Sequence, residues 1–168
     1  MREVKFKDKP TKIVDGFPNV GEQAKDFELI RPDLSVAQLK DFDGKIKLLN
    51  IFVSLDTPVC AKSITAFDTA SKAFMDLIVL NISMDLPFAA SRFCISSQME
   101  QAVTLSTFRS AFPDDYGVRI ADGPLKGLCA RAIILLGKDN RVIYTELVEE
   151  ITQEPNYGAV LDAIKQVV

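Results

Sequence analysis

The sequence predicts an α/β fold in which a central mixed sheet is flanked by helices. Two nearly continuous apolar runs, residues 46–53 and 77–82, have the length and composition of buried strands. An amphipathic helical pattern lies between them, with Ile64, Phe67 and Phe74 on one face. A strand, a helix and a strand in this order predict a parallel pair joined by a right-handed crossover. A later hairpin and a C-terminal helix complete the order β-α-β, β-β-α, which is that of a thioredoxin-like fold.

Size and composition predict a single soluble domain spanning residues 1–168. Hydrophobic residues make up 48% of the chain and charged residues 26%, as in ordinary globular proteins. The net charge of −3 gives no reason to expect a nucleic-acid partner. No apolar run approaches the ~20 residues that cross a bilayer, and residues 1–9 lack the apolar segment of a signal peptide. We therefore expect a cytoplasmic protein that does not bind membranes.

The N-terminal part of the chain predicts short extended segments. Residues 4–14 predict a β-hairpin, with its turn at residues 8–10. Residues 27–30 predict a strand that ends in a turn at residues 31–33. Residues 34–42 have no decisive pattern.

Short elements are also predicted between the parallel strands and the later hairpin. The segment Asp85-Leu86-Pro87 has the composition of a helix start, and residues 88–94 predict a short helix after it. Residues 103–105 predict a strand, and residues 108–112 predict a short helix that ends at Pro113.

The last third of the chain predicts the hairpin and the final helix. Residues 130–136 and 141–147 predict antiparallel strands joined by a turn at residues 137–140. The apolar residues Val160, Leu161, Ile164 and Val168 predict a C-terminal amphipathic helix after Pro155-Asn156. We find no internal repeat and no linker, which agrees with one domain.

The predicted crossover helix begins at a turn that contains a cysteine. Thr57 is a favoured N-cap residue, and Pro58 suits the first helical position. This places Cys60 in the first turn, where the helix dipole and free backbone N–H groups favour a thiolate over a thiol. A free cysteine is more often a small buried hydrophobe, but this capped, proline-started turn favours a nucleophile at Cys60.

The absence of histidine narrows the chemistry that is open to Cys60. It excludes Ser-His-Asp and Cys-His catalysis within the chain and disfavours zinc and haem sites, so we expect no cofactor and no metal. Cys60 must be activated by the helix dipole, by hydrogen bonds and by Arg or Lys. Position 63 is Ser63, so the Cys-x-x-Cys motif of dithiol oxidoreductases is absent. An ordinary thiol-disulfide oxidoreductase is therefore disfavoured.

Several motifs in order resemble the bacterial thiol peroxidases, which are atypical two-cysteine peroxiredoxins. The motifs are residues 54–60 (Ser-Leu-Asp-Thr-Pro-Val-Cys), 84–89, 91–94, 123–128, 130–132, 147–152 and 154–157. The resemblance extends over nearly the whole chain and implies the peroxiredoxin form of the thioredoxin-like fold. It also implies a thiol-dependent peroxidase that reduces hydrogen peroxide and alkyl hydroperoxides, with thioredoxin as reductant and a homodimer as the assembly.

The resemblance assigns roles to individual residues. It implies that Cys60 is the peroxidatic cysteine and that Cys94 is the resolving cysteine, so that a Cys60–Cys94 disulfide forms in each cycle. It further implies that Thr57 hydrogen-bonds the thiolate and the peroxide, and that Arg131 is the active-site arginine. The chain departs from the general peroxiredoxin pattern Pro-x-x-x-Thr-x-x-Cys at one position, where Val53 replaces the proline.

The chemistry of the residues is compatible with these roles. Attack of a thiolate on a peroxide places negative charge on the departing oxygen, which the helix N–H groups, the Thr57 hydroxyl and the Arg131 guanidinium would stabilise. The product is a sulfenic acid on Cys60, which condenses with a second thiol. Because both Cys60 and Cys94 lie in predicted helices, we expect local unwinding before a disulfide forms.

Some questions stay open at this level. A redox-sensing binding module that uses the same disulfide is the alternative function. Cys129 matches no family role, and we expect an inert buried thiol there. We also expect an exposed apolar patch near Val59, Phe93 and Cys129, which would fit a substrate collar or a dimer contact.

Overall fold

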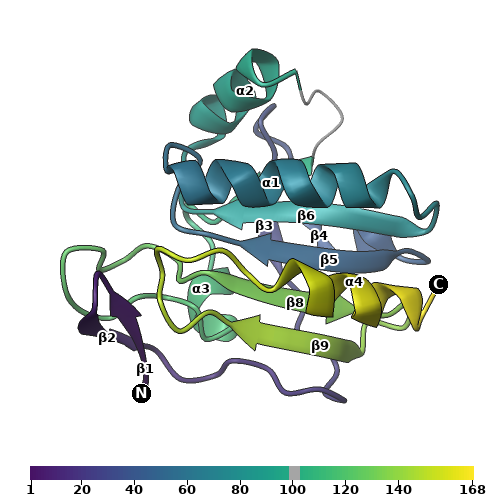
Figure 1. Cartoon of the computed structure of the whole chain (residues 1–168). Helices are drawn as coiled ribbons and strands as arrows, with labels where there is room; N and C mark the ends of the chain where they lie inside the picture. The colour runs from purple at the N-terminus through teal and green to yellow at the C-terminus, as the bar shows by residue number, and fades with distance from the viewer. Residues whose placement is uncertain (99–102) are drawn as a thin grey trace.

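The computed structural model describes residues 1–98 and 103–168. Within these residues, seven strands form one mixed sheet and two more form a separate N-terminal hairpin (Figure 1). The strands are β1 (Arg2–Phe6), β2 (Lys9–Ile13), β3 (Glu28–Ile30), β4 (Val36–Gln38), β5 (Ile46–Ile51), β6 (Leu77–Ser83), β7 (Val103–Ser106), β8 (Ala132–Leu136) and β9 (Val142–Leu147). The helices are α1 (Pro58–Ser71), α2 (Pro87–Ser96), α3 (Phe112–Asp115) and α4 (Tyr157–Lys165), with a 3-10 helix η1 (Leu39–Phe42). No helix in the described ranges is both long enough and apolar enough to span a bilayer.

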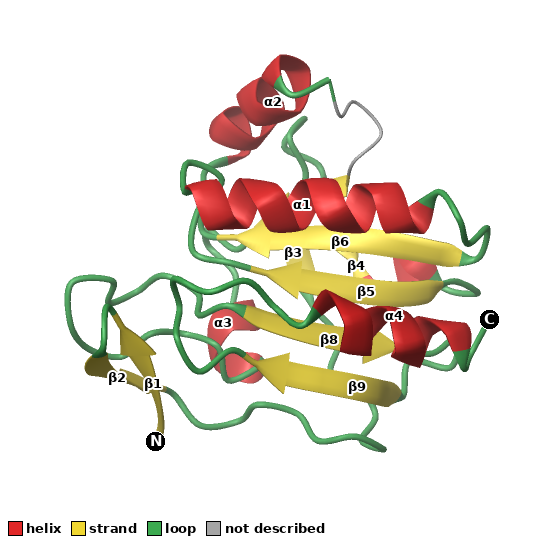
Figure 2. Cartoon of the chain, viewed as in Figure 1, coloured by secondary structure: helices red, strands yellow, loops and turns green. Residues whose placement is uncertain are grey.

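The order of strands confirms the predicted mixed sheet. The strands lie in the order β4-β3-β7-β6-β5-β8-β9. β5 pairs in parallel with β6, as the predicted crossover requires, and β6 pairs in parallel with β7. β8 pairs antiparallel with both β5 and β9. Figure 2 shows α1 and α4 on one side of the sheet and α3 on the other.

Both faces of β5 are covered, which explains why its sequence is a continuous apolar run. Every residue of β5 is buried. On one face Leu48 belongs to a cluster with Phe67 of α1 and Ile164 of α4. On the other face Leu49 belongs to a cluster with Phe112 at the start of α3. The central strand is therefore fixed from both sides, and its C-terminal end leads directly into the turn that contains Cys60.

The N-terminal hairpin is present, but its turn comes earlier than the sequence predicted. Lys7 and Asp8 form the turn, with φ values of 51° and 65°. Positive φ at both central residues gives the twist that tight hairpins favour. Pro10, expected in the turn, lies in β2 opposite Lys5. The two-stranded sheet consists of edge strands, where a residue without an N–H group is tolerated.

The predicted helix at residues 108–112 is wrong. Helix α3 begins at Phe112 and contains Pro113 in its first turn. The N–H groups of a first helical turn have no partner within the helix, so proline is compatible with a helix start as well as with a helix end. The undecided segment 34–42 forms β4 and η1.

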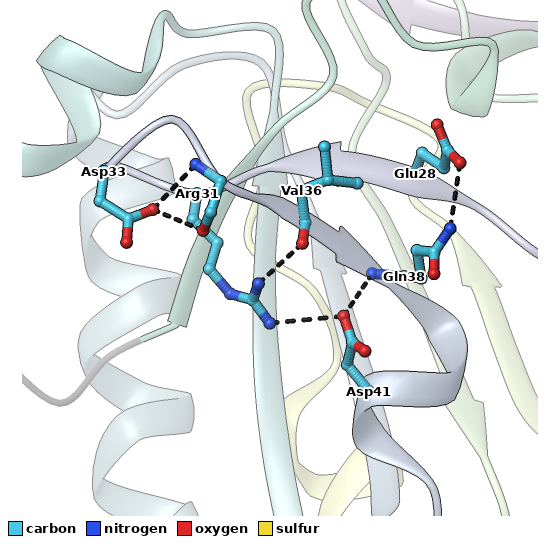
Figure 3. A network of polar contacts seen from close by, with 7 residues as sticks. Glu28, Arg31, Asp33, Val36, Gln38 and Asp41 are labelled. Carbon is cyan, nitrogen blue, oxygen red and sulfur yellow. Dashed lines mark hydrogen bonds and ion pairs between the residues drawn. The ribbon is translucent and has the colours of Figure 1, made fainter.

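A polar network fixes the hairpin of β3 and β4 (Figure 3). The Asp33 carboxylate accepts hydrogen bonds from the N–H group and the hydroxyl of Ser35, at 2.9 and 2.6 Å. Arg31 donates to the carbonyl of Val36 at 2.8 Å and pairs with Asp41 at 3.6 Å. The turn between β3 and β4 is therefore held by its own residues.

The close approach of the backbone at Gly117 to Phe17 generates a stability prediction. Gly117 has a φ of +62°, and a Cβ atom at this position would lie 2.1 Å from the backbone nitrogen of Phe17. Gly44 has a φ of +83°, but a Cβ atom there would meet nothing within 4 Å. Gly44→Ala should lower the free energy of unfolding by about 1–2 kcal/mol, the cost of a side chain in a left-handed conformation. Gly117→Ala should lose a further ~1–3 kcal/mol from the clash. Urea denaturation of both variants measures the difference, and equal losses would contradict the close approach of Gly117 to Phe17.

Candidate active site

The first turn of α1 forms as the sequence predicted. Thr57 is the N-cap residue, with φ −96° and ψ 139°, Pro58 is the first helical residue and Cys60 the third. The Thr57 side chain, however, makes no capping hydrogen bond to the helix. Its hydroxyl donates instead to the carbonyl of Ser54 at 2.9 Å. The Thr57 hydroxyl therefore donates its proton to a residue outside the helix, and its oxygen can still accept a hydrogen bond from another group.

A buried arginine contacts the sulfur of Cys60. The Cys60 side chain is completely buried, and Arg131, directly before β8, is 3% exposed. The Nη2 atom of Arg131 lies 3.1 Å from Sγ of Cys60. The Nε atom donates to the carbonyl of Ile151 at 2.9 Å, which fixes the plane of the guanidinium. The buried Nη1 atom has no partner among the described residues. The arrangement therefore offers a positive charge next to the sulfur and one free donor beside it.

Apolar side chains enclose the pair. Cys60 belongs to a cluster of buried residues that also contains Phe52, Val53 and Leu55. Val53 is 5% exposed, so valine forms part of this wall at the position where the general peroxiredoxin pattern has proline. Such surroundings exclude water and strengthen electrostatic interactions between groups inside them.

Tyr157 of α4 lies near Cys60 and Arg131. Its ring packs against Phe67 of α1, with ring centroids 5.3 Å apart. Its hydroxyl donates to Glu154 at 3.3 Å. Burial, followed by the charge of Glu154, raises the pKa of Tyr157 to about 12. Tyr157 therefore stays protonated at neutral pH and adds no second negative charge near Cys60.

Cys94 lies on α2 and has different neighbours from Cys60. It is half-buried, and its Sγ atom is 3.6 Å from the hydroxyl of Thr104 on β7. The adjacent Phe93 packs instead against the cluster that contains Cys60. Successive side chains on a helix point about 100° apart, so Phe93 and Cys94 face different neighbours. Both cysteines are free thiols, and the structure brings Cys60 together with Arg131 but leaves Cys94 against β7.

Cys129 is buried in a different part of the core. It is completely buried, and desolvation raises the pKa of its thiol to about 12. The expected burial of Cys129 is confirmed, so Cys129 forms no part of an exposed apolar patch near Val59 and Phe93. The apolar side chains that are exposed on and beside α2 are those of Leu86, Phe88 and Ile95.

Two features of the site were not visible in the sequence. The carbonyl that orients Arg131 belongs to Ile151, a loop residue whose polar role is carried by the backbone. Asp85, predicted only as part of a helix start, accepts hydrogen bonds from Ser54 and Leu55. These contacts join segments far apart in the chain, so no local pattern indicates them.

The described residues offer no metal site. Across residues 1–98 and 103–168, no three side chains of His, Cys, Asp or Glu come together in a way that could hold a metal ion. The site itself offers, among the described residues, a buried cysteine sulfur, a buried guanidinium with one unpartnered N–H group, and an apolar wall. This set suits a two-electron reaction at sulfur.

Comparisons with known proteins agree with this geometry. Residues 19–161 match the Redoxin family. The thiol peroxidase of Mycobacterium bovis is 48% identical over 164 residues, which cover 98% of this chain and 99% of that protein. The thiol peroxidase of Mycobacterium tuberculosis strain H37Rv matches to the same extent.

Solved structures share the fold. A peroxiredoxin-like protein from Aquifex aeolicus has a TM-score of 0.94 and 34% identity, with 100% of this chain and 98% of that chain covered. The thiol peroxidase from Chromobacterium violaceum has a TM-score of 0.88 and covers 98% of this chain and 95% of its own; at 24% identity it supports the fold alone. The predicted thioredoxin-like fold and the resemblance to the bacterial thiol peroxidases are both confirmed. The chain belongs to the redoxin family and, within it, to the thiol peroxidases, which are peroxidases of the peroxiredoxin type.

Proposed function

We propose that the protein reduces hydroperoxides at Cys60, with Arg131 and Thr57 as the groups that bind and orient the peroxide. The contact of 3.1 Å between Nη2 of Arg131 and Sγ of Cys60 carries this proposal. Arg131 forms no ion pair with a carboxylate among the described residues. A buried charge without a partner is costly. A thiolate at Cys60 would supply the counter-charge.

In the first step, the Cys60 thiolate attacks one peroxide oxygen. A sulfur lone pair forms the S–O bond, the O–O bond breaks, and its electron pair leaves on the second oxygen, which takes up a proton to give an alcohol or water. Sulfur is oxidised to a sulfenic acid. The free Nη1–H group of Arg131 would stabilise the charge on the departing oxygen. Because Thr57 donates its own proton to Ser54, its oxygen is available to accept the O–H group of the hydroperoxide.

In the second step, the thiolate of Cys94 attacks the sulfenic sulfur of Cys60: an S–S bond forms, the S–O bond breaks, and the oxygen takes up a proton and leaves as water. A disulfide requires the two Cα atoms to approach within about 7 Å. Cys94 faces Thr104 in this structure, and each cysteine lies within a helix. Local unwinding of one or both helices must therefore precede the disulfide.

The family supports the enzyme over the redox-sensing module, since the two mycobacterial relatives are named as thiol peroxidases. We extend the proposal to thioredoxin as the dithiol that reduces the Cys60–Cys94 disulfide, to a homodimer as the assembly and to the cytoplasm as the location. The three free thiols suit a reducing compartment. Each of these extensions follows from the family resemblance.

Cysteine variants test the two-step mechanism. Cys60→Ser should abolish hydroperoxide reduction, because the nucleophile is lost. Cys94→Ser should consume one equivalent of hydroperoxide and then stall, because no resolving thiol is present. Cys129→Ala, which removes a buried thiol outside the mechanism, should keep turning over. NADPH oxidation coupled through thioredoxin reductase and thioredoxin measures all three, and sustained turnover by Cys94→Ser would refute its resolving role.

Arginine variants test the guanidinium. Arg131→Ala should lower the second-order rate constant for peroxide by roughly one hundredfold, the scale for loss of one transition-state donor. Arg131→Lys keeps a positive charge but not the forked donor, so it should recover only part of the rate. Arg119→Ala, which removes a partly exposed arginine paired with Asp114, is the control and should leave the rate unchanged. An unchanged rate constant in Arg131→Ala would contradict a role in the reaction and leave Arg131 with a structural role alone.

The pKa of Cys129 predicts its reactivity. A thiol with a pKa of about 12 stays protonated until the pH rises toward that value, and only the thiolate is alkylated. At pH 8 about one in ten thousand of such thiols is ionised, against roughly a quarter for a thiol with the ordinary pKa of about 8.5. Native protein treated with iodoacetamide at pH 8 should therefore leave Cys129 unmodified, and unfolding in urea should expose it. Peptide mass spectrometry measures this, and rapid native labelling of Cys129 would contradict its burial.

A further inference from the structure

The carboxylate of Asp85 connects the two loops that lead into the cysteine-bearing helices. Asp85 lies between β6 and α2, directly before the N-cap residue of the helix that carries Cys94. Its Oδ1 atom accepts the hydroxyl of Ser54 at 2.8 Å, and its Oδ2 atom accepts the N–H group of Leu55 at 2.8 Å. Both donors lie in the loop between β5 and α1, which leads to Cys60. One side chain therefore holds the two loops together.

Asp85 also forms hydrogen bonds with the last residues of β6 and β7. Ser83 at the end of β6 donates to Oδ2 of Asp85 at 2.7 Å. Ser106, the last residue of β7, donates its hydroxyl to the backbone carbonyl of Asp85. Thr104, on the same strand, is the residue that contacts Cys94. Because β5, β6 and β7 run parallel, their C-terminal ends meet at one edge of the sheet, and Asp85 lies where they meet.

The role of Asp85 requires a carboxylate, because both of its side-chain oxygens accept hydrogen bonds. Within the described residues, Asp85 forms no ion pair with Lys, Arg or the N-terminus. Its charge is directed at hydroxyl and N–H donors, and hydrogen bonds to an ionised acceptor are stronger than neutral ones. An asparagine of the same shape would replace one acceptor oxygen with an NH₂ donor. It could not accept from both Ser54 and Leu55.

The loop contact reaches Cys60 through Ser54 and Thr57. The carbonyl of Ser54 accepts the hydroxyl of Thr57 at 2.9 Å and its N–H group at 3.2 Å. Thr57 is the N-cap residue of α1, so its placement decides where the first turn begins. While Asp85 holds Ser54, the helical turn around Cys60 is supported from outside the helix. When Asp85 releases Ser54, that support is lost.

We propose that Asp85 is a positioning residue that acts as a latch between the Cys60 loop and the Cys94 loop. The closed latch favours the peroxide step, because it keeps the first turn of α1 folded against Arg131. It opposes the disulfide step, because that step needs the helices to unwind. This inference rests on the proposed function and assigns Asp85 control over the balance between its two steps.

Asp85→Asn separates the two steps. Reduced protein is mixed rapidly with excess hydroperoxide, quenched with acid at successive times, alkylated and analysed by intact-protein and peptide mass spectrometry. This gives one rate constant for oxidation of the Cys60 thiol, a second for formation of the Cys60–Cys94 disulfide, and the fraction of Cys60 driven to sulfinic acid. The variant should oxidise Cys60 about three- to tenfold more slowly and form the disulfide faster by a similar factor, the scale of one lost hydrogen bond. Its sulfinic acid fraction should fall.

Asp33→Asn is the matched control. Asp33 also accepts hydrogen bonds from a serine hydroxyl and a backbone N–H group, but both come from Ser35 in the turn between β3 and β4 (Figure 3). It contacts neither cysteine-bearing loop through these bonds, so both rate constants should equal those of the wild type. Ser54→Ala removes one donor from the latch and leaves Asp85 in place. It should change the two rate constants in the same directions as Asp85→Asn, by smaller factors.

The outcomes are distinct. Opposite changes in the two rate constants support the latch. Equal losses in both steps, or no change in either, overturn it and leave the proposed function intact. If Asp85→Asn does not fold, Ser54→Ala decides by the same criterion. A wild-type protein that forms no Cys60–Cys94 disulfide would overturn the proposed function, and the latch with it.

Discussion

The contact between the Arg131 guanidinium and the Cys60 sulfur depends on the register of two central strands. Ile51 at the end of β5 pairs with Ala132 at the start of β8, so the residues just beyond this pair are brought to one end of the sheet. A loop over residues 52–57 leads from β5 to the first turn of α1, which contains Cys60, and Arg131 directly precedes β8. A slip of one residue between these strands would turn every side chain to the opposite face and carry Arg131 away from the sulfur. The apolar packing on both faces of β5, which fixes the register, is therefore also what holds the site together.

The same packing creates a conflict between the two steps of the proposed catalytic cycle. Burial of Cys60 beside Arg131 excludes water from the sulfur, but it also keeps Cys60 away from Cys94, which we propose as the resolving thiol. Cys94 is held by Thr104 on a neighbouring strand. A site made more rigid would react with peroxide and then be slow to form its disulfide, whereas a looser site would lose the geometry for attack. Polar contacts at the loop ends, such as that of Asp85 with Ser54, are where such a balance can be adjusted without disturbing the core.

The sequence was sufficient to predict most features that depend only on residues close together in the chain. The turn at Thr57 and Pro58 and the buried strand predicted at residues 46–53 follow from short-range chemistry. Both are in the structure, where the strand ends two residues earlier, at Ile51. Proline misled the prediction near Pro113, because it is compatible with either end of a helix and only tertiary packing selects between them. From the local pattern, Arg131 could be placed only as a charged residue at the start of a buried strand. Its proposed role at the active site came from the resemblance to the thiol peroxidases. Its fixation by the carbonyl of Ile151 could not have been predicted, because a backbone acceptor leaves no trace in residue type.

Of the two remaining cysteines, only Cys94 has surroundings that suit a disulfide partner for Cys60. Cys129 packs in the cluster on the other side of the sheet from α1, with Leu49 and Ile51, and burial keeps its thiol protonated. Attack on an oxidised sulfur requires a thiolate and access to it. Cys94 is half-buried, contacts the polar Thr104 and lies two residues before the last residue of α2, in the part of a helix that frays most easily. The cost of bringing Cys94 to Cys60 is thus the unwinding of a helix end, whereas Cys129 could reach it only by opening the core that fixes the site.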